Sequence, residues 1–252
     1  MKLISSFLLG ATLVLIFEPF NFWLLGFLLP ISFYFLIRKE NIKNSFILGS
    51  FFGLGLWLFG IFWIENSIYF YGGANRISSY FLIICLSVFL SLLSGTFFSI
   101  FSFCKTKTDF DILFLFPSVW VSLEFLREFV FSGFPWFYLG YTTLDNFFVS
   151  GFVPIIGVFG MSFILIFIPA AIYVSYKSFF KEYKYKIKTS YISILFLILF
   201  SSFMTYQVDW TKEKEKVNVV IIQPNISIDE KWSLAGELES IDLFKAKIKE
   251  HS

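Results

Sequence analysis

Long apolar runs, separated by short polar or basic connections, make up the first 208 residues. Inside a bilayer every backbone amide needs a hydrogen-bond partner within the chain, so each apolar run is predicted to form a helix. The predicted helices cover about residues 3–17, 22–37, 46–64, 80–103, 112–126, 153–176 and 191–208. The pattern therefore predicts an all-α, polytopic membrane helical bundle with about seven spans.

Basic residues in the connections predict how these helices are threaded, because cytoplasmic loops retain Lys and Arg. The N-terminus and alternate connections carry eleven of them, namely Lys2, Arg38, Lys39, Lys43, Lys105, Lys107, Lys177, Lys181, Lys184, Lys186 and Lys188. The other connections carry only Arg76 and Arg127. We therefore expect a multi-pass protein with an N-in arrangement, whose segment after Val208 lies outside the cytoplasm.

The composition agrees with a lipid environment. Hydrophobic residues make up 57% of the 252 positions and charged residues 15%, against roughly 45–50% and 25% in a soluble domain. The net charge of +2 and the scattered Lys residues exclude a nucleic-acid partner. Cys85 and Cys104 lack metal-binding or redox spacing and are predicted to pack within the bundle, so we expect no metal and no cofactor.

The N-terminal apolar run resembles a secretory signal in length. No small-residue cleavage site follows it, however, and Glu18-Pro19 interrupts the run instead. We therefore interpret it as an uncleaved first span.

The pattern changes after the last apolar run. Residues 209–216 read as a charged linker, residues 217–222 as a short buried strand, and residues 234–249 as an amphipathic helix. A strand and a helix with no sheet partner cannot bury their apolar faces, so the second domain looks incomplete. The predicted organisation is a transmembrane helical domain at 1–208, a linker at 209–216, and the truncated start of an α/β domain at 217–252.

Several polar and glycine positions near the predicted spans invite a functional interpretation. Glu124 and Arg127 are three residues apart on one helix, which favours an i,i+3 ion pair. The glycine pairs Gly49/Gly53 and Gly157/Gly160 are interpreted as helix-packing positions. The aromatic connection at 132–146 is typical of an interfacial belt, and its sequence order also admits a substrate-binding loop.

Ordered motifs along most of the chain resemble the apolipoprotein N-acyltransferases of bacterial inner membranes. They are Phe17-Glu18-Pro19-Phe20 with Trp23, residues 49–55 leading to Phe62-Trp63-Ile64, residues 117–121, Gly133-Phe134-Pro135-Trp136 through Leu139-Gly140-Tyr141 with Asp145, residues 154–160, and residues 217–226 with Lys231-Trp232. The last of these looks like the opening of the family's nitrilase-like (carbon-nitrogen hydrolase) domain.

This resemblance implies an enzyme of lipoprotein maturation. Its phospholipid partner donates an acyl chain, and its diacylated lipoprotein partner accepts that chain on the amine of its N-terminal cysteine. The family's catalytic Glu, Lys and Cys belong to the nitrilase-like domain, beyond the strand and helix present here. We therefore expect no catalytic residue in this chain and expect it to be inactive alone. The resemblance implies substrate-binding roles for Trp232, Trp136, Phe134 and Tyr141.

Two other functional hypotheses remain open from the sequence. The chain could be a non-catalytic membrane module, or half of a split enzyme, that binds lipid or lipoprotein. A transporter or channel subunit is a third class, although no pair of corresponding Gly/Pro-broken spans supports an inverted-repeat carrier.

Overall fold

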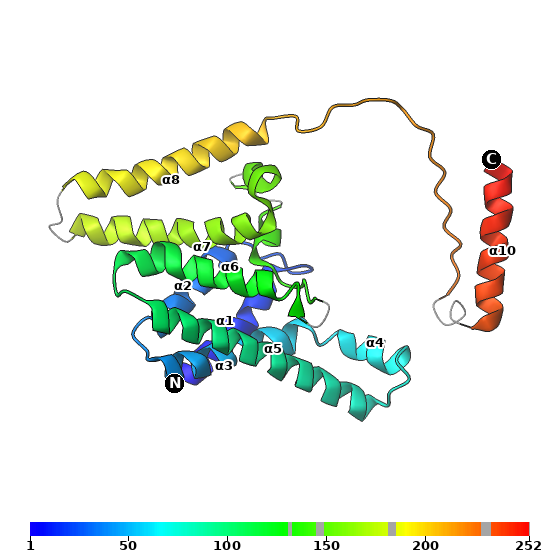
Figure 1. Ribbon diagram of the computed structural model, residues 1–252, viewed down its shortest axis with the longest axis horizontal. Coiled ribbons are helices and arrows are strands. Elements are labelled where there is room, and N and C mark those ends of the chain that lie inside the picture. The colour runs from blue at the N-terminus through cyan, green and yellow to red at the C-terminus, as the bar shows by residue number, and fades with distance from the viewer. Residues whose placement is uncertain (131–132, 145–148, 181–184, 228–232, 252) are drawn as a thin grey trace. The chain divides into compact units, whose positions relative to one another are not determined.

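The computed structural model describes residues 1–130, 133–144, 149–180, 185–227 and 233–251. Within these ranges the chain forms helices and turns but no β-strand (Figure 1). The α-helices are α1 (Lys2–Leu13), α2 (Leu25–Ile37), α3 (Ile42–Gly60), α4 (Ile64–Phe70), α5 (Arg76–Cys104), α6 (Phe116–Leu126), α7 (Val153–Phe180), α8 (Tyr185–Tyr206) and α10 (Leu234–His251). Single helical turns are η1 (Val14–Ile16), η2 (Asp111–Leu115, a π-helix), η4 (Leu139–Thr143) and η5 (Ser150–Phe152).

A helix lies at each of the seven positions that the apolar runs predict. Three segments among the described residues are long and apolar enough to cross a membrane, namely Ile42–Gly60, Arg76–Cys104 and Ser150–Lys177. The apolar helices Lys2–Ile16, Leu25–Ile37 and Phe196–Tyr206 are shorter. The chain is therefore a helical membrane protein. The short helix α4 was not predicted, and the π-helix η2 precedes α6 where one continuous helix was expected.

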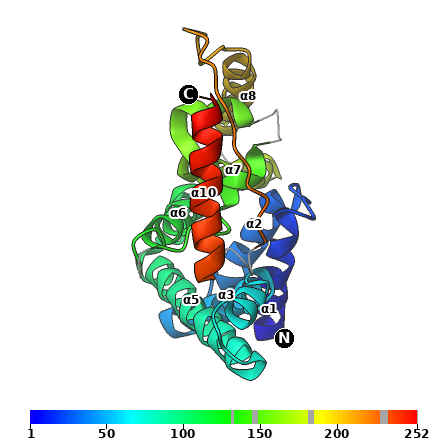
Figure 2. The same ribbon diagram turned by 90° about the vertical axis from the view of Figure 1, so that its right-hand side faces the viewer.

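Helices α3 and α5 pack closely because small residues line their contact (Figure 2). A Cβ atom added at Gly49 would lie 2.8 Å from the Phe98 ring, and one added at Gly53 would lie 2.8 Å from the Cα atom of Ser91. Buried serines on α5, among them Ser91, donate hydrogen bonds to carbonyl groups of their own helix. The Gly49/Gly53 pair is therefore a packing position, as predicted, and it brings two backbones together within one chain.

The opposite side of α3 contacts α1 in the same way. A Cβ atom at Gly10 would lie 1.9 Å from the backbone oxygen of Phe52, and one at Gly55 would lie 2.1 Å from the backbone oxygen of Phe7. These atoms belong to helix backbones, which cannot shift without moving a whole helix. Helix α3 therefore touches backbone on two sides.

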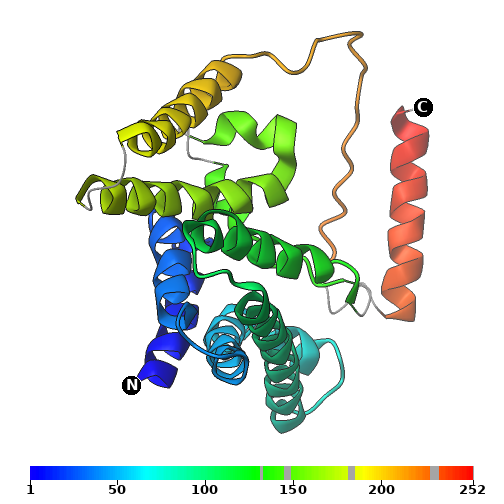
Figure 3. The same ribbon diagram turned by 60° about the vertical axis from the view of Figure 1, so that its left-hand side comes forward.

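Aromatic rings fill the space between α2, α3, α5 and α6. Phe33 lies 4.3 Å from Phe52 and 4.7 Å from Phe98, measured between ring centroids, and all three side chains are buried. Phe116 and Trp120 extend the cluster along α6, which lies between α5 and α7 (Figure 3). The rings meet in edge-to-face, tilted and stacked arrangements and pack without polar groups, so this core suits a bundle surrounded by lipid.

Helix α7 is kinked at Gly157, where the backbone has φ 62° and ψ −173°. No atom lies within 4 Å of a Cβ added there. The packing role predicted for Gly157 is therefore wrong, because the residue provides a left-handed backbone conformation that other residues rarely adopt. Gly160, on the same helix, is crowded by the side chain of Ile156.

The chain divides into two compact units, Met1–Val208 and Asp209–Ser252. In the second unit, α10 lies where the sequence predicts an amphipathic helix. The predicted strand at 217–222 is not formed, and its apolar side chains are largely exposed. A strand needs a neighbouring strand for its backbone hydrogen bonds, and the described residues contain none.

Glu40, in the connection between α2 and α3, joins three parts of the first unit. Its carboxylate accepts hydrogen bonds from Lys2 near the N-terminus and from Asn44 Nδ2 at 2.9 Å. Its backbone oxygen accepts from Ser102 Oγ at 2.9 Å and from Lys105, at the end of α5. The hydrogen bond from Lys2, and then that from Asn44, lowers the pKa of the Glu40 carboxyl.

We expect Gly55→Val to destabilise the first unit by at least about 2 kcal/mol, because the added side chain would press against the α1 backbone. Thr96→Val, which places the same side chain at an exposed position on α5, is the matched control and should change stability by less than about 0.5 kcal/mol. Denaturation of the purified protein in detergent micelles measures both. Equal stabilities for the two variants would contradict the close contact of α1 and α3.

We expect the stabilising effect of Glu40 to depend on pH. An acid whose pKa is lower in the folded than in the unfolded chain stabilises the fold above its unfolded pKa, about 4.5 here, and loses this effect as the pH falls through the folded value. Glu40→Gln should therefore lower the unfolding midpoint at pH 6, and the difference should shrink below pH 4.5. A difference between Glu40→Gln and the parent that is constant with pH would disprove the assignment.

Candidate functional site

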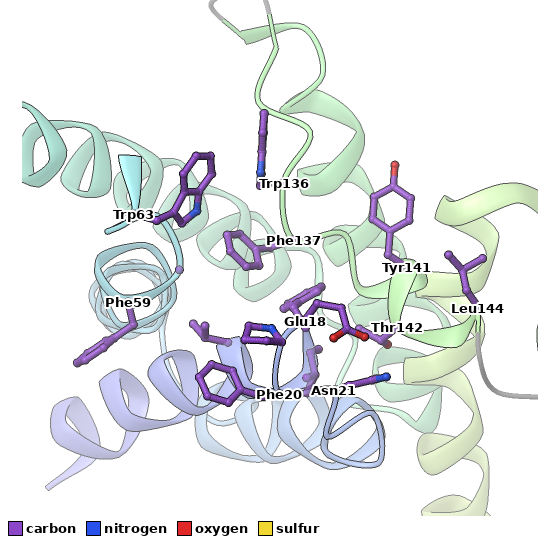
Figure 4. A pocket seen from close by; sticks show the side chains of 15 residues that line it. Glu18, Phe20, Asn21, Phe59, Trp63, Trp136, Phe137, Tyr141, Thr142 and Leu144 are labelled. Carbon is purple, nitrogen blue, oxygen red and sulfur yellow. The ribbon is translucent and has the colours of Figure 1, made fainter. Parts of the chain in front are cut away.

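A cavity of about 650 Å³ opens at the C-terminal end of α3 (Figure 4). Three segments that are distant in sequence form its walls: the connection after η1, the end of α3 with the residue before α4, and the aromatic connection that contains η4. Its lining residues are Val14, Ile16, Phe17, Glu18, Pro19, Phe20, Asn21, Phe59, Gly60, Trp63, Trp136, Phe137, Tyr141, Thr142 and Leu144. The walls are thus mainly aromatic and apolar.

Phe137 joins the three walls of this cavity. Its ring lies 4.8 Å from Phe17 and 5.9 Å from Trp57, between centroids, in edge-to-face geometry. A Cβ atom at Gly60 would lie 2.9 Å from the same ring, so glycine at the end of α3 leaves the space that Phe137 occupies. In Figure 4, Glu18 lies between Phe137 and Thr142.

A buried carboxylate on α6 holds the aromatic connection in place. Glu124 Oε1 accepts a hydrogen bond from Trp120 Nε1 at 3.0 Å and another from the backbone N–H of Leu139 at 2.8 Å. The Glu124 side chain is 2% exposed and Leu139 is 1% exposed. A buried carboxylate needs such donors, and here one of them fixes the position at which η4 begins.

Arg127 is the second buried charge at this end of α6. Although Glu124 and Arg127 are both described, no ion pair within 4.0 Å joins them, so the predicted i,i+3 pair is wrong. The guanidinium instead lies over the ring of Trp57, with Cζ 4.9 Å from the centroid, and over that of Tyr138 at 5.2 Å. The Arg127 backbone oxygen accepts from the N–H of Phe134 at 2.7 Å, which fixes the start of the aromatic connection.

A third anchor comes from α7. The backbone N–H of Gly140 donates to Ser162 Oγ at 2.8 Å. A Cβ atom at Gly140 would lie 2.0 Å from the backbone oxygen of Val158, so only glycine permits this close approach. The connection is thereby held from α6 and from α7, while Trp136 and Tyr141 remain exposed at the rim of the cavity.

The lining chemistry favours binding of an apolar chain. Among the described residues that line the cavity, Glu18 is the only ionisable acid or base other than Tyr141, and there is no Cys, His or Lys. Exposed Trp63 and Trp136 lie 6.2 Å apart between ring centroids and are typical of a membrane–water boundary. The shape and the apolar lining of the cavity can therefore hold and orient a lipid chain, and its described lining contains no thiol.

Two of the predicted substrate-binding residues, Trp136 and Tyr141, line this cavity. Phe134 does not; its ring lies 5.1 Å from Trp136, and its side chain lines a separate cavity of about 370 Å³ with Arg127 and Cys85. Trp232 lies outside the described residues, as does Asp145 of the aromatic connection.

The sequence analysis did not assign individual substrate-binding roles to the lining residues Phe17, Phe20 and Phe59. The sequence did contain an indication that these segments matter, because residues 17–20 and 62–64 belong to the ordered motifs that carry the family resemblance. What the sequence did not show is that these motifs meet around one cavity.

Neither cysteine lines this cavity, and the described residues contain no candidate metal site. Cys85 and Cys104 are free and exposed on α5, so the prediction that they pack within the bundle is wrong. Within the described part of the chain, no group of three or more His, Cys, Asp or Glu residues could hold a metal ion.

The residues that line this cavity lie within the part of the chain that matches known proteins. A family model, the apolipoprotein N-acyltransferase N-terminal domain, matches residues 9–171. Apolipoprotein N-acyltransferases of Coxiella burnetii and Wigglesworthia glossinidia brevipalpis are each 34% identical to the chain, over 92% and 90% of its length. That of Pasteurella multocida is 27% identical over 94% of the chain. The aligned regions are 47%, 44% and 45% of these relatives, so the chain spans less than half of their length.

We expect Glu124→Ala to release the aromatic connection, because it leaves the buried N–H groups of Trp120 and Leu139 without an acceptor, at about 1–3 kcal/mol each. The Leu139 amide should exchange its hydrogen at least about tenfold faster, as measured by hydrogen exchange and mass spectrometry in detergent micelles. Glu128→Ala, at an exposed glutamate one helical turn further on, should leave this rate unchanged. Unaltered exchange in Glu124→Ala would show that the carboxylate does not hold the loop.

Proposed function

Because the chain belongs to the apolipoprotein N-acyltransferase family, we propose that it forms the membrane part of an enzyme that moves an acyl chain from a phospholipid to a lipoprotein. The acceptor is the α-amino group of the N-terminal cysteine of a diacylated lipoprotein. The main support is the cavity of about 650 Å³, whose lining includes Phe17, Glu18, Trp63, Trp136 and Tyr141 from the motifs that carry the family resemblance. The phospholipid donor and the lipoprotein acceptor are the proposed partners.

The proposed topology is seven spans with the N-terminus in the cytoplasm of a bacterial cell and the bundle in its inner membrane. The distribution of Lys and Arg supports it. The cavity lies at the C-terminal end of α3, whereas Arg38, Lys39 and Lys43 lie near its N-terminal end. With this threading the cavity opens at the periplasmic leaflet, and the segment after Val208 is periplasmic.

Residues Trp136 and Tyr141 are proposed to contact the acyl chains of the donor at the cavity rim. The Phe134 ring packs against the ring of Trp136, and the Phe134 side chain lines the neighbouring cavity. The anchoring of the loop by Glu124 keeps these rings in place, so little side-chain freedom is lost when a lipid binds. Glu124 is thus proposed as a positioning residue that does not touch the substrate.

The proposed domain organisation is a transmembrane domain at 1–208, a linker at 209–216, and the start of a nitrilase-like domain at 217–252. In that domain residues 217–222 would pair with a neighbouring strand, and Trp232 would lie near the active-site entrance. The resemblance supplies the chemistry: a Cys thiolate attacks the phospholipid ester, releasing a lysophospholipid and leaving a thioester. The lipoprotein amine then attacks the thioester, which forms the amide and frees the thiol.

The test is acyl transfer by the protein made from the whole reading frame that contains this chain. The purified protein is incubated in mixed micelles with a phospholipid and a synthetic diacylated lipopeptide, and mass spectrometry detects the added acyl group. Addition at the peptide's N-terminal amine is expected. A protein that binds both lipids without transferring the acyl group would instead be a non-catalytic or split module.

We expect Trp136→Ala to raise KM for the phospholipid about tenfold, because it removes an exposed aromatic surface worth roughly 1.5 kcal/mol of lipid contact, with a smaller effect on kcat. Phe129→Ala removes a similarly exposed ring outside the cavity and should change KM less than twofold. If both variants behave alike in the micelle assay, the cavity rim does not bind the donor.

A further inference from the structure

A second cavity, of about 430 Å³, lies at the opposite end of the bundle from the aromatic one. The connection between α2 and α3, the connection between α5 and η2, and the C-terminal part of α7 form its walls. Five basic residues line it, namely Arg38, Lys39, Lys105, Lys107 and Lys177. Nothing in the proposed acyl transfer uses this cavity.

The two acids of this cavity are already engaged. Asp109 pairs with Lys177 at 2.6 Å. Asp111 accepts hydrogen bonds from the backbone N–H groups of Thr106 at 2.7 Å and Lys107 at 2.6 Å, so its carboxylate folds its own loop. With five basic residues and two acids, the lining therefore carries a net positive charge.

Three of the basic residues have no acidic partner in the part of the chain that the structure describes: Arg38, Lys39 and Lys107 take part in no ion pair within 4.0 Å there. The Arg38 guanidinium lies over the Phe35 ring, 4.8 Å from its centroid. Burial, and after it the nearby charge of Lys107, lowers the pKa of the Lys105 ammonium. Such a cluster is stabilised by an anion.

The location of the cavity indicates which anion. Arg38 directly follows α2 and Lys105 directly follows α5, so the charges lie where apolar helices end. Beside them Phe103, Phe110 and Phe114 are exposed by 74%, 52% and 43%. A soluble phosphate would use only the charges, whereas a phospholipid also covers the exposed rings with its acyl chains.

We propose that this cavity binds the anionic headgroup of a phospholipid in the leaflet at the basic end of the bundle. Arg38, Lys39 and Lys107 contact the phosphodiester, and the acyl chains lie along the exposed rings of the α5–α6 region. On the proposed topology this is the cytoplasmic leaflet. The bound lipid would brace the connections that join α2, α5 and α7, at the far end of α3 from the acyl-donor cavity.

The test compares lipid binding by the full chain and by two variants with the same loss of charge. Arg38→Gln, Lys39→Gln and Lys107→Asn together remove the unpaired cations; Asn suits the positive φ of residue 107. The control combines Lys212→Gln, Lys214→Gln and Lys216→Gln in the exposed linker. The probe is ether-linked phosphatidylglycerol, which offers no ester to cleave, titrated in neutral detergent micelles; phosphatidylethanolamine is the zwitterionic comparison.

We expect the parent chain and the linker control to bind phosphatidylglycerol more tightly than phosphatidylethanolamine. The pocket variant should lose about a hundredfold in phosphatidylglycerol affinity, since each basic residue near an anionic lipid is worth roughly fivefold. A loss below tenfold, an equal loss in the linker control, or full displacement of the lipid by millimolar inorganic phosphate would overturn the proposal. If the pocket variant does not fold, Lys39→Gln alone, at an exposed position, replaces it: about a fivefold loss is expected, and less than twofold would overturn the proposal.

Discussion

Direct contact between helix backbones is the constraint on which the first unit depends. In lipid there is no hydrophobic gain from bringing two apolar helices together, so association relies on close packing. Helix α3 meets α1 through Gly10 and Gly55, and it meets α5 through Gly49 and Gly53. With both sides fixed in this way, the two ends of α3 occupy defined positions. One end lies at the aromatic cavity and the other follows the basic connection.

Two buried charged residues, Glu124 and Arg127, fix the position of the aromatic connection. A carboxylate among apolar helices is expensive unless donors surround it, and Glu124 recruits one of its donors from the backbone of the aromatic connection. Arg127 is accommodated by the faces of Trp57 and Tyr138, whose π-electrons attract a cation. Both interactions offset the cost of burying a charge, and both hold the aromatic connection in a fixed position. This is why a stretch without regular helix or strand can still present Trp136 and Tyr141 in set positions.

The sequence predicts the helices well because apolar length is a direct requirement of the bilayer, and a helix is found at each predicted position. It predicts contacts less well. The three-residue spacing of Glu124 and Arg127 identifies neighbours on a helix, but it cannot show that a connection fifteen residues later returns to Glu124. Gly157 has the same spacing signal as a packing glycine, and only the backbone angles reveal its kink. The strand at 217–222 fails for a related reason, because a strand is defined by a partner that lies elsewhere in sequence.

The two cavities place different demands on a lipid. The aromatic cavity has one carboxylate and no Lys or Arg among its described lining residues, so it contributes no positive charge to attract a headgroup. On the proposed function, this cavity would recognise the acyl chain of a lipid, and the headgroup would stay in water. The basic cavity would do the reverse on our proposal: its charges would contact a phosphate, while the exposed apolar side chains lie outside it. On the proposed function, a donor lipid would enter and leave during turnover, which favours recognition through mobile acyl chains. The lipid proposed for the basic cavity would stay in place, which favours recognition through several charges at once.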